Sequence, residues 1–389
     1  MTSRAVSRCV LGLLIVTSTA VIVKFKPTQS YERAKFVAAY EIRDMGAAPG
    51  AAYRVIYLGA LRGHHTVYHG GAISNGVVGT SINLANRTDE YDPQPCLVDT
   101  RHDPASVVVL NEGTSGHGGI VFSINSSGQA TGTFANHTLF FDGRTARSLL
   151  PLEGRTNCEG RCISSTGDIS GFSFSRGKDS YLHETATLWS RSGVPQDLGI
   201  PSGCVSSRAN AINDQGQIAV AAITKKVRTR SFIYERGHFT DLGSLGGVAT
   251  VAEAINSAGQ IVGTSEVRRG IFHAFLWEKG HMRDLGVLAK IHTYCKATGV
   301  NNRGEVCGWS GVGEGWNSIT RPFVWDANGG MRDLTKEVGY GSLFQPRTAY
   351  GISDEGEVLV YGYRKRFWHT VQGLSVLKPF HNGSQEKTR

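Results

Sequence analysis

Three features of the sequence predict an all-β fold, and more specifically a β-propeller of about seven four-stranded blades whose ring is closed by an N-terminal strand. A ten-residue motif, seen as AINSAGQIVG at 254–263, recurs along the chain. Each copy is followed by two more strand-like stretches before the next copy begins. The composition combines 49 glycines, 11 prolines and only 19% charged residues, which is typical of many short strands and tight turns.

The motif is predicted to be a β-hairpin. In AINDQGQIAV at 211–220, a short apolar run meets Asn213 and Gly216, and an alternating pattern then resumes. An asparagine side chain can bond the backbone of a turn, and glycine adopts the left-handed conformation that closes it. Seven units of this size are typical of propellers and solenoids. The glycines of the seven copies are Gly76, Gly128, Gly167, Gly216, Gly259, Gly304 and Gly356.

Two further strands complete each unit and separate the two architectures. The third strand is seen as HAFLW at 273–277, and the fourth as MRDLG at 282–286, after a turn that contains glycine. Four short strands with turns at matching places fit a propeller blade better than a solenoid coil. No unit contains an amphipathic stretch of helix length, so a helical repeat is excluded.

The start of the repeat region is predicted to close the ring. YRVIYLGALRG at 53–63 matches the fourth strand of a unit, yet it precedes the first motif copy and has no earlier blade to join. We expect it to complete the last blade, whose first three strands lie near 348–370 and whose third strand is KRFWH at 365–369. The competing candidate for the closing position is LSVLK at 374–378.

The first 26 residues are predicted to be an export signal. Arg4 and Arg8 precede an apolar run at 9–23, which is short for a membrane-spanning helix and normal for a signal peptide. A small-residue cleavage site is present at 18–20, but the apolar run continues past it. Two locations therefore stay open: an exported protein, extracellular or periplasmic, and a protein anchored to the membrane through 9–23. The predicted parts are a signal peptide or anchor at 1–26, a linker at 27–52, the propeller at 53–379 and a disordered tail at 380–389.

Seven cysteines become six when Cys9 is set aside with the signal segment. An oxidising compartment permits up to three disulfides among six cysteines. Two pairs are close in sequence, Cys158 with Cys162 and Cys295 with Cys307, and each is a candidate disulfide. Buried free thiols that behave as small apolar side chains are the alternative for each pair.

With these stretches in view, the chain resembles the HAF family of probable extracellular repeat proteins, named for the His-Ala-Phe found here at 273–275. The resemblance rests on HAFLWEKGHMRDLG, AINSAGQIVG and DLGSLGGVATVAEAIN, spans about 53–370 and is strong at 186–335. It weakens before 160, where the first unit has the shortened AISNGVVG. The resemblance implies export and a repeat-built β fold. It supplies no activity and no catalytic residues to transfer.

The sequence offers no catalytic constellation and predicts no metal and no cofactor. The motifs HExxH and GxSxG and the Walker loop are absent. The cluster His64, His65 and His69 fits a solvated loop better than a metal site, because adjacent side chains of an extended segment point in opposite directions. The carboxylates that come first as catalytic candidates each occupy the same position of their repeat. This recurrence favours a role in turns and strand ends. They are Asp197, Asp241, Asp284 and Asp333.

Basic residues recur in the connections between the second and third strands, and propeller topology would place all these connections on one face. A long glycine-rich connection of the same kind, GWSGVGEGWNS, is flanked by two tryptophans. Flat aromatic rings beside fixed cations can bind sugar rings and acidic groups together. Exposed tips that carry Lys and Arg only for solubility are the alternative. The candidate ligand-binding residues are Arg176, Lys178, Lys225, Lys226, Arg228, Arg230, Arg268, Arg269, Trp309, Trp316, Arg364, Lys365 and Arg366.

These observations favour a monomeric, non-enzymatic, exported propeller that binds an anionic polysaccharide or a protein partner through one basic face. The alternative is a hydrolase or lyase that acts on polysaccharide in the propeller mouth, with two carboxylates from the set Glu90, Asp92, Asp103 and Glu112 as acid and base. A structural envelope protein is a third hypothesis. Nucleic-acid binding is disfavoured, because the basic residues lack an aromatic recognition module.

Overall fold

The computed structural model describes residues 40–45, 51–61, 71–83, 93–101, 106–110, 118–177, 182–313, 320–339, 342–366 and 369–380. Within these ranges the regular elements are β-strands, apart from one four-residue helix, α1 (Leu334–Glu337). Most strands belong to four-stranded antiparallel sheets. The predicted all-β class is confirmed.

Six hydrogen-bonded sheets contain the strands, and chain order is also spatial order within most of them. The first sheet contains β3 (Ala72–Ser74), β4 (Val77–Asn83), β5 (Pro93–Asp99) and β6 (Ser106–Val109). The second contains β7 (Gly119–Ile124), β8 (Ala130–Phe134), β9 (His137–Phe141) and β10 (Ala146–Leu149). The third contains β11 (Asn157–Ile163), β12 (Ile169–Arg176), β13 (Leu182–Trp189) and β14 (Pro195–Gly199). The fourth sheet is β15 (Cys204–Ile212), β16 (Ile218–Thr224), β17 (Thr229–Glu235) and β18 (His238–Asp241).

The fifth sheet contains two repeat units. These are β19 (Thr250–Ile255), β20 (Ile261–Arg268), β21 (Ile271–Glu278) and β22 (His281–Gly286), then β23 (Tyr294–Val300), β24 (Val306–Gly311), β25 (Thr320–Asp326) and β26 (Gly330–Asp333). A single parallel pair, Phe272 with Tyr294, joins the two units. The last sheet contains β27 (Phe344–Ile352), β28 (Val358–Arg366) and β29 (His369–Pro379), with β2 (Tyr53–Leu61) and β1 (Tyr40–Asp44) from the N-terminal part.

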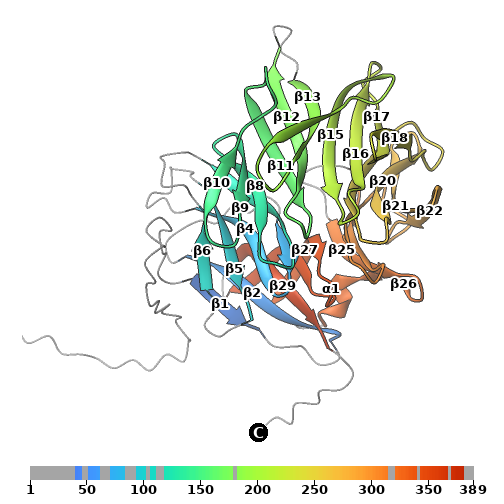
Figure 1. The fold of residues 1–389 in the computed structure, drawn as a ribbon. Coiled ribbons are helices and arrows are strands. Elements are labelled where there is room, and N and C mark those ends of the chain that lie inside the picture. The colour runs from blue at the N-terminus through green and yellow to red at the C-terminus, as the bar shows by residue number, and fades with distance from the viewer. Residues whose placement is uncertain are drawn as a thin grey trace, which may run out of the picture.

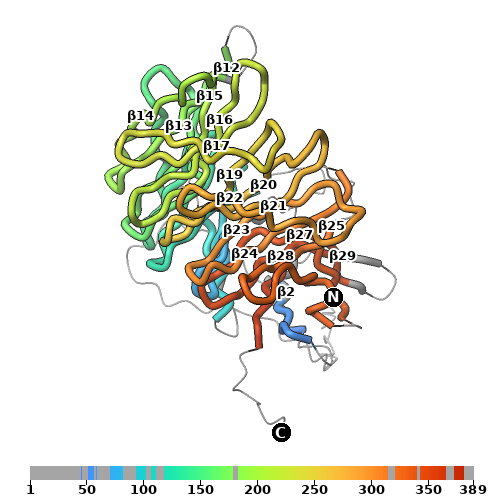
Figure 2. Tube along the Cα trace, turned by 90° about the vertical axis from the view of Figure 1, so that its right-hand side faces the viewer, coloured from blue at the N-terminus to red at the C-terminus, as the bar shows by residue number. Residues whose placement is uncertain are grey.

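The units follow one another around a common centre in chain order, and the red C-terminal strands lie beside the blue N-terminal ones (Figure 1). Each first strand packs on the next in the order β3, β7, β11, β15, β19, β23, β27, and β27 also contacts β3. Figure 2 shows the same succession from the side. Apolar clusters fill the spaces between neighbouring units; one of them, for example, contains Ile233 of one unit and Ile261 and Phe275 of the next. The first strands therefore line the centre, and the fourth strands lie outermost.

Each motif copy is a hairpin turn, as predicted, and all seven motif glycines have positive φ. In the copy at 254–263, Gly259 N–H donates to Asn256 O (3.0 Å). The side-chain oxygen of Asn256 accepts from the N–H groups of Ala258 (3.1 Å) and Gln260 (3.0 Å). Its Nδ2 donates to Asn301 O, 2.9 Å away in the next copy. The asparagine thus closes its own turn and binds the neighbouring unit.

The last sheet combines both ends of the repeat region. β2 pairs antiparallel with β29, with Tyr53 opposite Pro379 and Leu58 opposite Leu374. The stretch 374–378 belongs to β29, the third strand, so it does not occupy the fourth position. The predicted third strand at 365–369 is wrong, because β28 continues to Arg366 and β29 begins only at His369. The predicted linker also contains a strand, because β1 pairs with β2 as a fifth member of the sheet.

Two of the four predicted fourth strands are observed in full, and two stop at their aspartate, as β18 does at Asp241. Pro195–Gly199 and His281–Gly286 are strands, as expected. In MRDLT the strand stops at Asp333, whose side chain accepts from Thr335 N–H (2.9 Å) and caps helix α1. The threonine replaces the glycine of the other copies, so the left-handed turn that ends those strands does not form here.

Neither predicted disulfide is present, and the six cysteines in the described residues are free thiols. A β-bulge between Gly160 and Cys162 shifts the strand by one residue, so Cys158 and Cys162 point to opposite faces of the sheet. Their Sγ atoms reach different carbonyls, Leu149 O (3.3 Å) and Ile212 O (3.6 Å). In the other pair, Cys295 faces Ser310 while Cys307 faces Gly299, so the strand register separates the two thiols.

Burial raises the pKa of Cys96, Cys295 and Cys307 to about 12. A rise of this size lowers the thiolate fraction at pH 8 about 1000-fold, so these thiols are expected to react with a thiol reagent only after unfolding. Because the thiols hold their protons more tightly in the folded state, their contribution to stability is complete below the unfolded pKa of 9.0 and is lost as pH rises from 9 towards 12. Thiol labelling with and without urea measures how far folding protects these thiols from the reagent. Rapid labelling of these positions in the folded protein would contradict it.

No helix within the described residues is long and apolar enough to cross a membrane. The apolar run at 9–23 and the tail at 381–389 lie outside those residues.

Candidate binding cleft and the face that carries it

The predicted basic tips lie at one end of the sheets. The motif turns bind one another around the opposite end, as in the contacts of Asn213 with Asn256 O (3.0 Å) and of Asn301 with Ser353 O (2.9 Å). Strands alternate in direction within each unit, so the second-to-third connections and the fourth-to-first links share the end away from these turns. We call this end the tip face and the other end the motif face. Exposed basic residues on the tip face are Arg176, Lys225, Lys226, Arg228, Arg230, Arg268 and Arg269.

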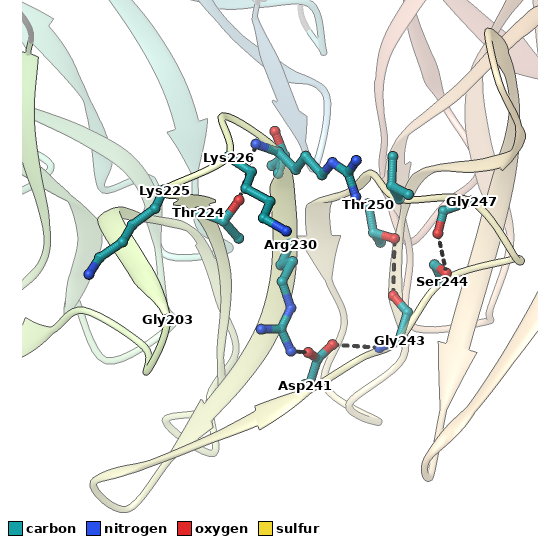
Figure 3. Close-up of a pocket in the computed structure, with 13 residues that line it drawn as sticks. Gly203, Thr224, Lys225, Lys226, Arg230, Asp241, Gly243, Ser244, Gly247 and Thr250 are labelled. Carbon is teal, nitrogen blue, oxygen red and sulfur yellow. Dashed lines mark hydrogen bonds and ion pairs between the residues drawn. The ribbon is translucent and has the colours of Figure 1, made fainter.

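Four of these residues line a cleft of about 460 Å³ on the tip face. The cleft lies between the β16–β17 tip and the link from β18 to β19 (Figure 3). Lys226 and Arg230 extend from the tip on one side, and Thr250 and Ser244 lie on the other. The basic lining residues are Lys225, Lys226, Arg228 and Arg230, and the hydroxyl lining residues are Thr224, Thr229, Ser244 and Thr250. We call this site the basic cleft.

The charge of the basic cleft is unbalanced. Arg230 pairs with Asp241, which also accepts from Gly243 N–H (2.8 Å). The side chains of Lys225, Lys226 and Arg228 are exposed and pair with no carboxylate among the described residues. Three cations without a carboxylate partner therefore line the cleft, although Lys225 points away from Lys226 and Arg230 in Figure 3, and such a lining suits sulfate, phosphate or carboxylate groups on a polar ligand.

The unit that carries the cleft departs from the repeat at its second strand. In the unit after it, Ser265 Oγ accepts from Leu245 N–H (3.0 Å), and the Glu266 carboxylate accepts from Val248 N–H (2.9 Å). These two contacts hold the incoming link against the second strand. At the matching positions of the cleft unit stand Ala222 and Ile223, which cannot accept such bonds.

The tip of this unit carries an unusual residue. Val227 has φ 56° at the position where the next unit has Gly270 (φ 76°). A β-branched side chain is disfavoured in this left-handed region. Two backbone bonds close the tip, from Val227 N–H to Thr224 O (2.8 Å) and from Thr224 N–H to Arg228 O (2.9 Å). The Val227 side chain is 84% exposed, so it makes no packing contact that explains its presence.

The remaining predicted ligand residues are not gathered at the cleft. Arg364 is only 8% exposed, so its prediction as an exposed tip residue is wrong; it lies within β28 between two partner strands. Trp309 is half-buried and stacks on Tyr294, with ring centroids 5.3 Å apart. Lys178 and Trp316 lie outside the described residues, and the side chains of Lys365 and Arg366 also do.

The recurrent aspartates act in turns, as predicted. Asp197 and Asp284 each accept from the glycine N–H two residues ahead, at 2.6 Å and 2.7 Å. Asp284 also contacts His273 Nδ1 (2.9 Å), in the position where Asp241 meets Arg230. In these two copies of the DLG stretch, the aspartate that closes the turn also contacts a basic side chain on the adjacent strand.

The sequence analysis did not predict a set of ion pairs that involve the first strands. Arg208 makes a bidentate pair with the buried Glu184. Glu253 pairs with Lys296 (2.7 Å), and Glu159 with Arg161 (2.9 Å). Their partners come from different strands or from across a bulge, so no local pattern could have indicated them. The four carboxylates proposed for an enzymatic mouth, Glu90, Asp92, Asp103 and Glu112, lie outside the described residues.

The described residues contain no group of histidines, cysteines and carboxylates that could hold a metal ion. The histidine cluster at 64–69 lies outside them.

Solved structures with a similar fold are β-propeller proteins. The β-propeller domain of the Trilobed protease from Pyrococcus furiosus has a TM-score of 0.51 at 10% identity, with 84% of this chain and 99% of that domain covered. An oligogalacturonate lyase from Vibrio parahaemolyticus has a TM-score of 0.56 at 9% identity, with 89% and 98% covered. An acylaminoacyl peptidase from Pyrococcus horikoshii has a TM-score of 0.53 at 11% identity, with 79% and 50% covered. The likeness shows that this chain has the β-propeller fold.

The chain spans about half the length of the acylaminoacyl peptidase and of a puromycin hydrolase that it also resembles. No protein-family model matches the sequence, and no curated protein matches it. At these identities the solved structures define the architecture and leave the activity to the site itself.

Proposed function

We propose that the chain is an exported, non-enzymatic β-propeller that binds a polyanion, such as an acidic polysaccharide or the acidic surface of a protein partner, through its tip face. The observation that carries the proposal is the basic cleft. Lys225, Lys226 and Arg228 line it without a carboxylate partner in the described part of the chain, beside the hydroxyls of Thr224 and Thr229. Such a site attracts anions and bonds their oxygens at once.

The proposed architecture is a closed ring of seven blades, with the eight-stranded sheet counted as two. Two observations support it: the first strands contact one another in a cycle from β3 to β27 and back, and β2 supplies the fourth strand beside β29. Membership of the HAF family belongs to the same proposal, supported by the repeated hairpin and DLG stretches at 211–216, 254–259 and 282–286.

A direct binding measurement tests the function. We expect the full chain to bind soluble polygalacturonate or heparin at low ionic strength, to lose most of that binding when salt is raised, and to ignore neutral dextran. Salt screens exposed charges with a Debye length of about 10 Å at 0.1 M, so contacts at an open cleft weaken strongly. Binding that does not respond to salt, or no binding to either polyanion, would refute the proposal.

The second candidate function is a hydrolase or lyase acting on polysaccharide in the mouth of the ring. The oligogalacturonate lyase supports this candidate by architecture alone. The ion pairs of Glu159, Glu184 and Glu253 count against it, because each carboxylate is already bound by Arg161, Arg208 or Lys296. Acid–base catalysis requires a carboxylate that can take up and release a proton. Release of new reducing ends or unsaturated products from polygalacturonate would favour the enzyme.

A further inference from the structure

Exposed aliphatic side chains gather on the tip face together with the cations. Ten large apolar side chains are exposed among the described residues, and only Val194 and Phe380 belong to the motif face. On the tip face, Val227 and Val312 lie in connections between second and third strands. The other exposed apolar residues of this face lie in links between units or at the start of a first strand. The eight on the tip face are Leu150, Ile200, Val205, Val227, Val248, Ile291, Val312 and Leu343.

These aliphatic side chains stand beside basic ones. Val227 lies between Lys226 and Arg228, and Ile291 follows the exposed Lys290. The motif face differs in charge, since its turns mix both signs. Exposed carboxylates of the motif face include Asp142, Asp214, Asp354 and Glu355. The tip face also exposes carboxylates, in Glu153, Asp197, Asp241 and Asp284, but exposed cations outnumber them there, and this face carries the single aliphatic groups.

The N-terminal part of the chain also joins the propeller at the tip face. Tyr40, the first residue of β1, pairs with Leu61, at the end of β2 that leads into a fourth-to-first link. The same sheet has its second-to-third connection at this end, where Arg366 pairs with His369. The predicted signal or anchor at 9–23 precedes β1 by the sixteen residues 24–39. Sixteen residues span at most about 55 Å when fully extended.

We infer that the polyanion recognised by the tip face is the surface of an anionic lipid bilayer, with the aliphatic tips entering the headgroup region and the cations binding lipid phosphates. This inference rests on the proposed function, because it assigns an occupant to the same basic face. A retained segment at 9–23 would keep a bilayer within about 55 Å of Tyr40, which lies at the tip-face end of β1.

The kind of exposed apolar group favours lipid over polysaccharide. Sugar rings are bound by flat aromatic side chains, and Phe380 is the only aromatic among the ten exposed large apolar residues. It follows Pro379, which pairs with Tyr53 at the opposite end of β2 from the tip face. Single aliphatic groups next to lysine and arginine suit an interface where acyl chains lie below phosphates.

The orientation can be measured with the full chain and vesicles of defined composition. An environment-sensitive fluorophore is attached at Val227→Cys on the tip face, or at Ala258→Cys in an exposed motif turn as the matched control. Vesicles contain phosphatidylcholine alone or with added phosphatidylglycerol, and their acyl chains carry a quencher. Unsubstituted protein labelled in parallel corrects for the native cysteines. We expect quenching and a blue shift at 227 with the anionic vesicles and neither at 258. Equal quenching at both positions, or none at 227, would overturn the inference.

A second variant separates lipid docking from general polyanion binding. Val227→Asn with Ile291→Asn removes two aliphatic tips, leaves every cation in place, and puts a residue that tolerates positive φ at 227. We expect its partitioning onto anionic vesicles to fall at least about tenfold, with binding to soluble polygalacturonate unchanged. Unsubstituted protein that binds polygalacturonate but not vesicles disproves the inference and leaves the proposed function standing. Failure to bind either one disproves both.

Discussion

Replacing Lys225, Lys226 and Arg228 together with serine is expected to weaken polyanion binding about 10- to 100-fold at low salt. The expectation assumes about 0.5–1 kcal/mol for each exposed charge contact, and 1.4 kcal/mol is a factor of about ten in affinity. All three side chains are exposed, so the fold should be kept. Titration with fluorescent polygalacturonate at two salt concentrations measures both the affinity and its salt dependence.

The matched control removes three charges from the motif face. Arg191→Ser, Arg236→Asn and Lys279→Asn change the net charge by the same amount at exposed turns. Asparagine is chosen at the last two because both have positive φ. If binding depends on the basic cleft, this control keeps most of its affinity. Similar losses in both variants would mean that overall charge, rather than the cleft, determines binding.

The substitution Asn256→Ala is expected to lower the free energy of unfolding by about 2–4 kcal/mol, because buried hydrogen-bonding groups lose their partner. Asn256 is 4% exposed, and its side chain joins Gln260 Oε1 (2.7 Å) and Asn301 O (2.9 Å) in addition to two turn N–H groups. Alanine leaves the N–H groups of its own turn and the carbonyl of the next unit without that partner. Urea unfolding followed by tryptophan fluorescence measures the change.

Two further variants show which bond matters. Serine occupies the asparagine position in two other copies, where Ser164 Oγ accepts from Asp168 N–H (3.1 Å) and Ser353 Oγ from Glu357 N–H (3.2 Å). Asn256→Ser should therefore keep the bond from Gln260 N–H, lose those to Gln260 Oε1 and Asn301 O, and cost about half as much as alanine. Ser257→Ala, where the contacts use the backbone, should stay within about 0.5 kcal/mol. An Asn256→Ala loss no larger than that would exclude the linking role.

Features that depend on a few neighbouring residues could be predicted from the sequence. The hairpin turns at Gly216 and Gly259 and the turn role of Asp284 follow from the conformations that Asn, Asp and Gly favour. The basic tips were found in the same way, because a repeat shows which positions vary between units. The prediction at 331–335 also failed for a local reason, since threonine stands at 335 in place of glycine and Asp333 caps helix α1 instead.

Features that depend on strand register could not be predicted from spacing. Cys158 and Cys162 are four residues apart, and only the bulge between Gly160 and Cys162 shows that they face opposite sides. Arg364 was predicted to lie in a connection between the second and third strands, but β28 is longer than its counterparts and buries it. The basic cleft itself was missed, because Thr250 and Ser244 belong to the link that follows the tip and come near it only in the folded chain.

The sequence by itself determined the repeating strand-turn-strand units, because a period of about 45 residues and the turn residues at its fixed positions specify local geometry. Only the tertiary structure decided how the units join. Asn256 binds the next unit, and β2 pairs with β29 from the far end of the chain. Such contacts join segments that are far apart in the sequence, and no local sequence pattern predicts that these segments come together. The tertiary structure likewise decided that three cations line one cleft and that Tyr40 lies on the same face.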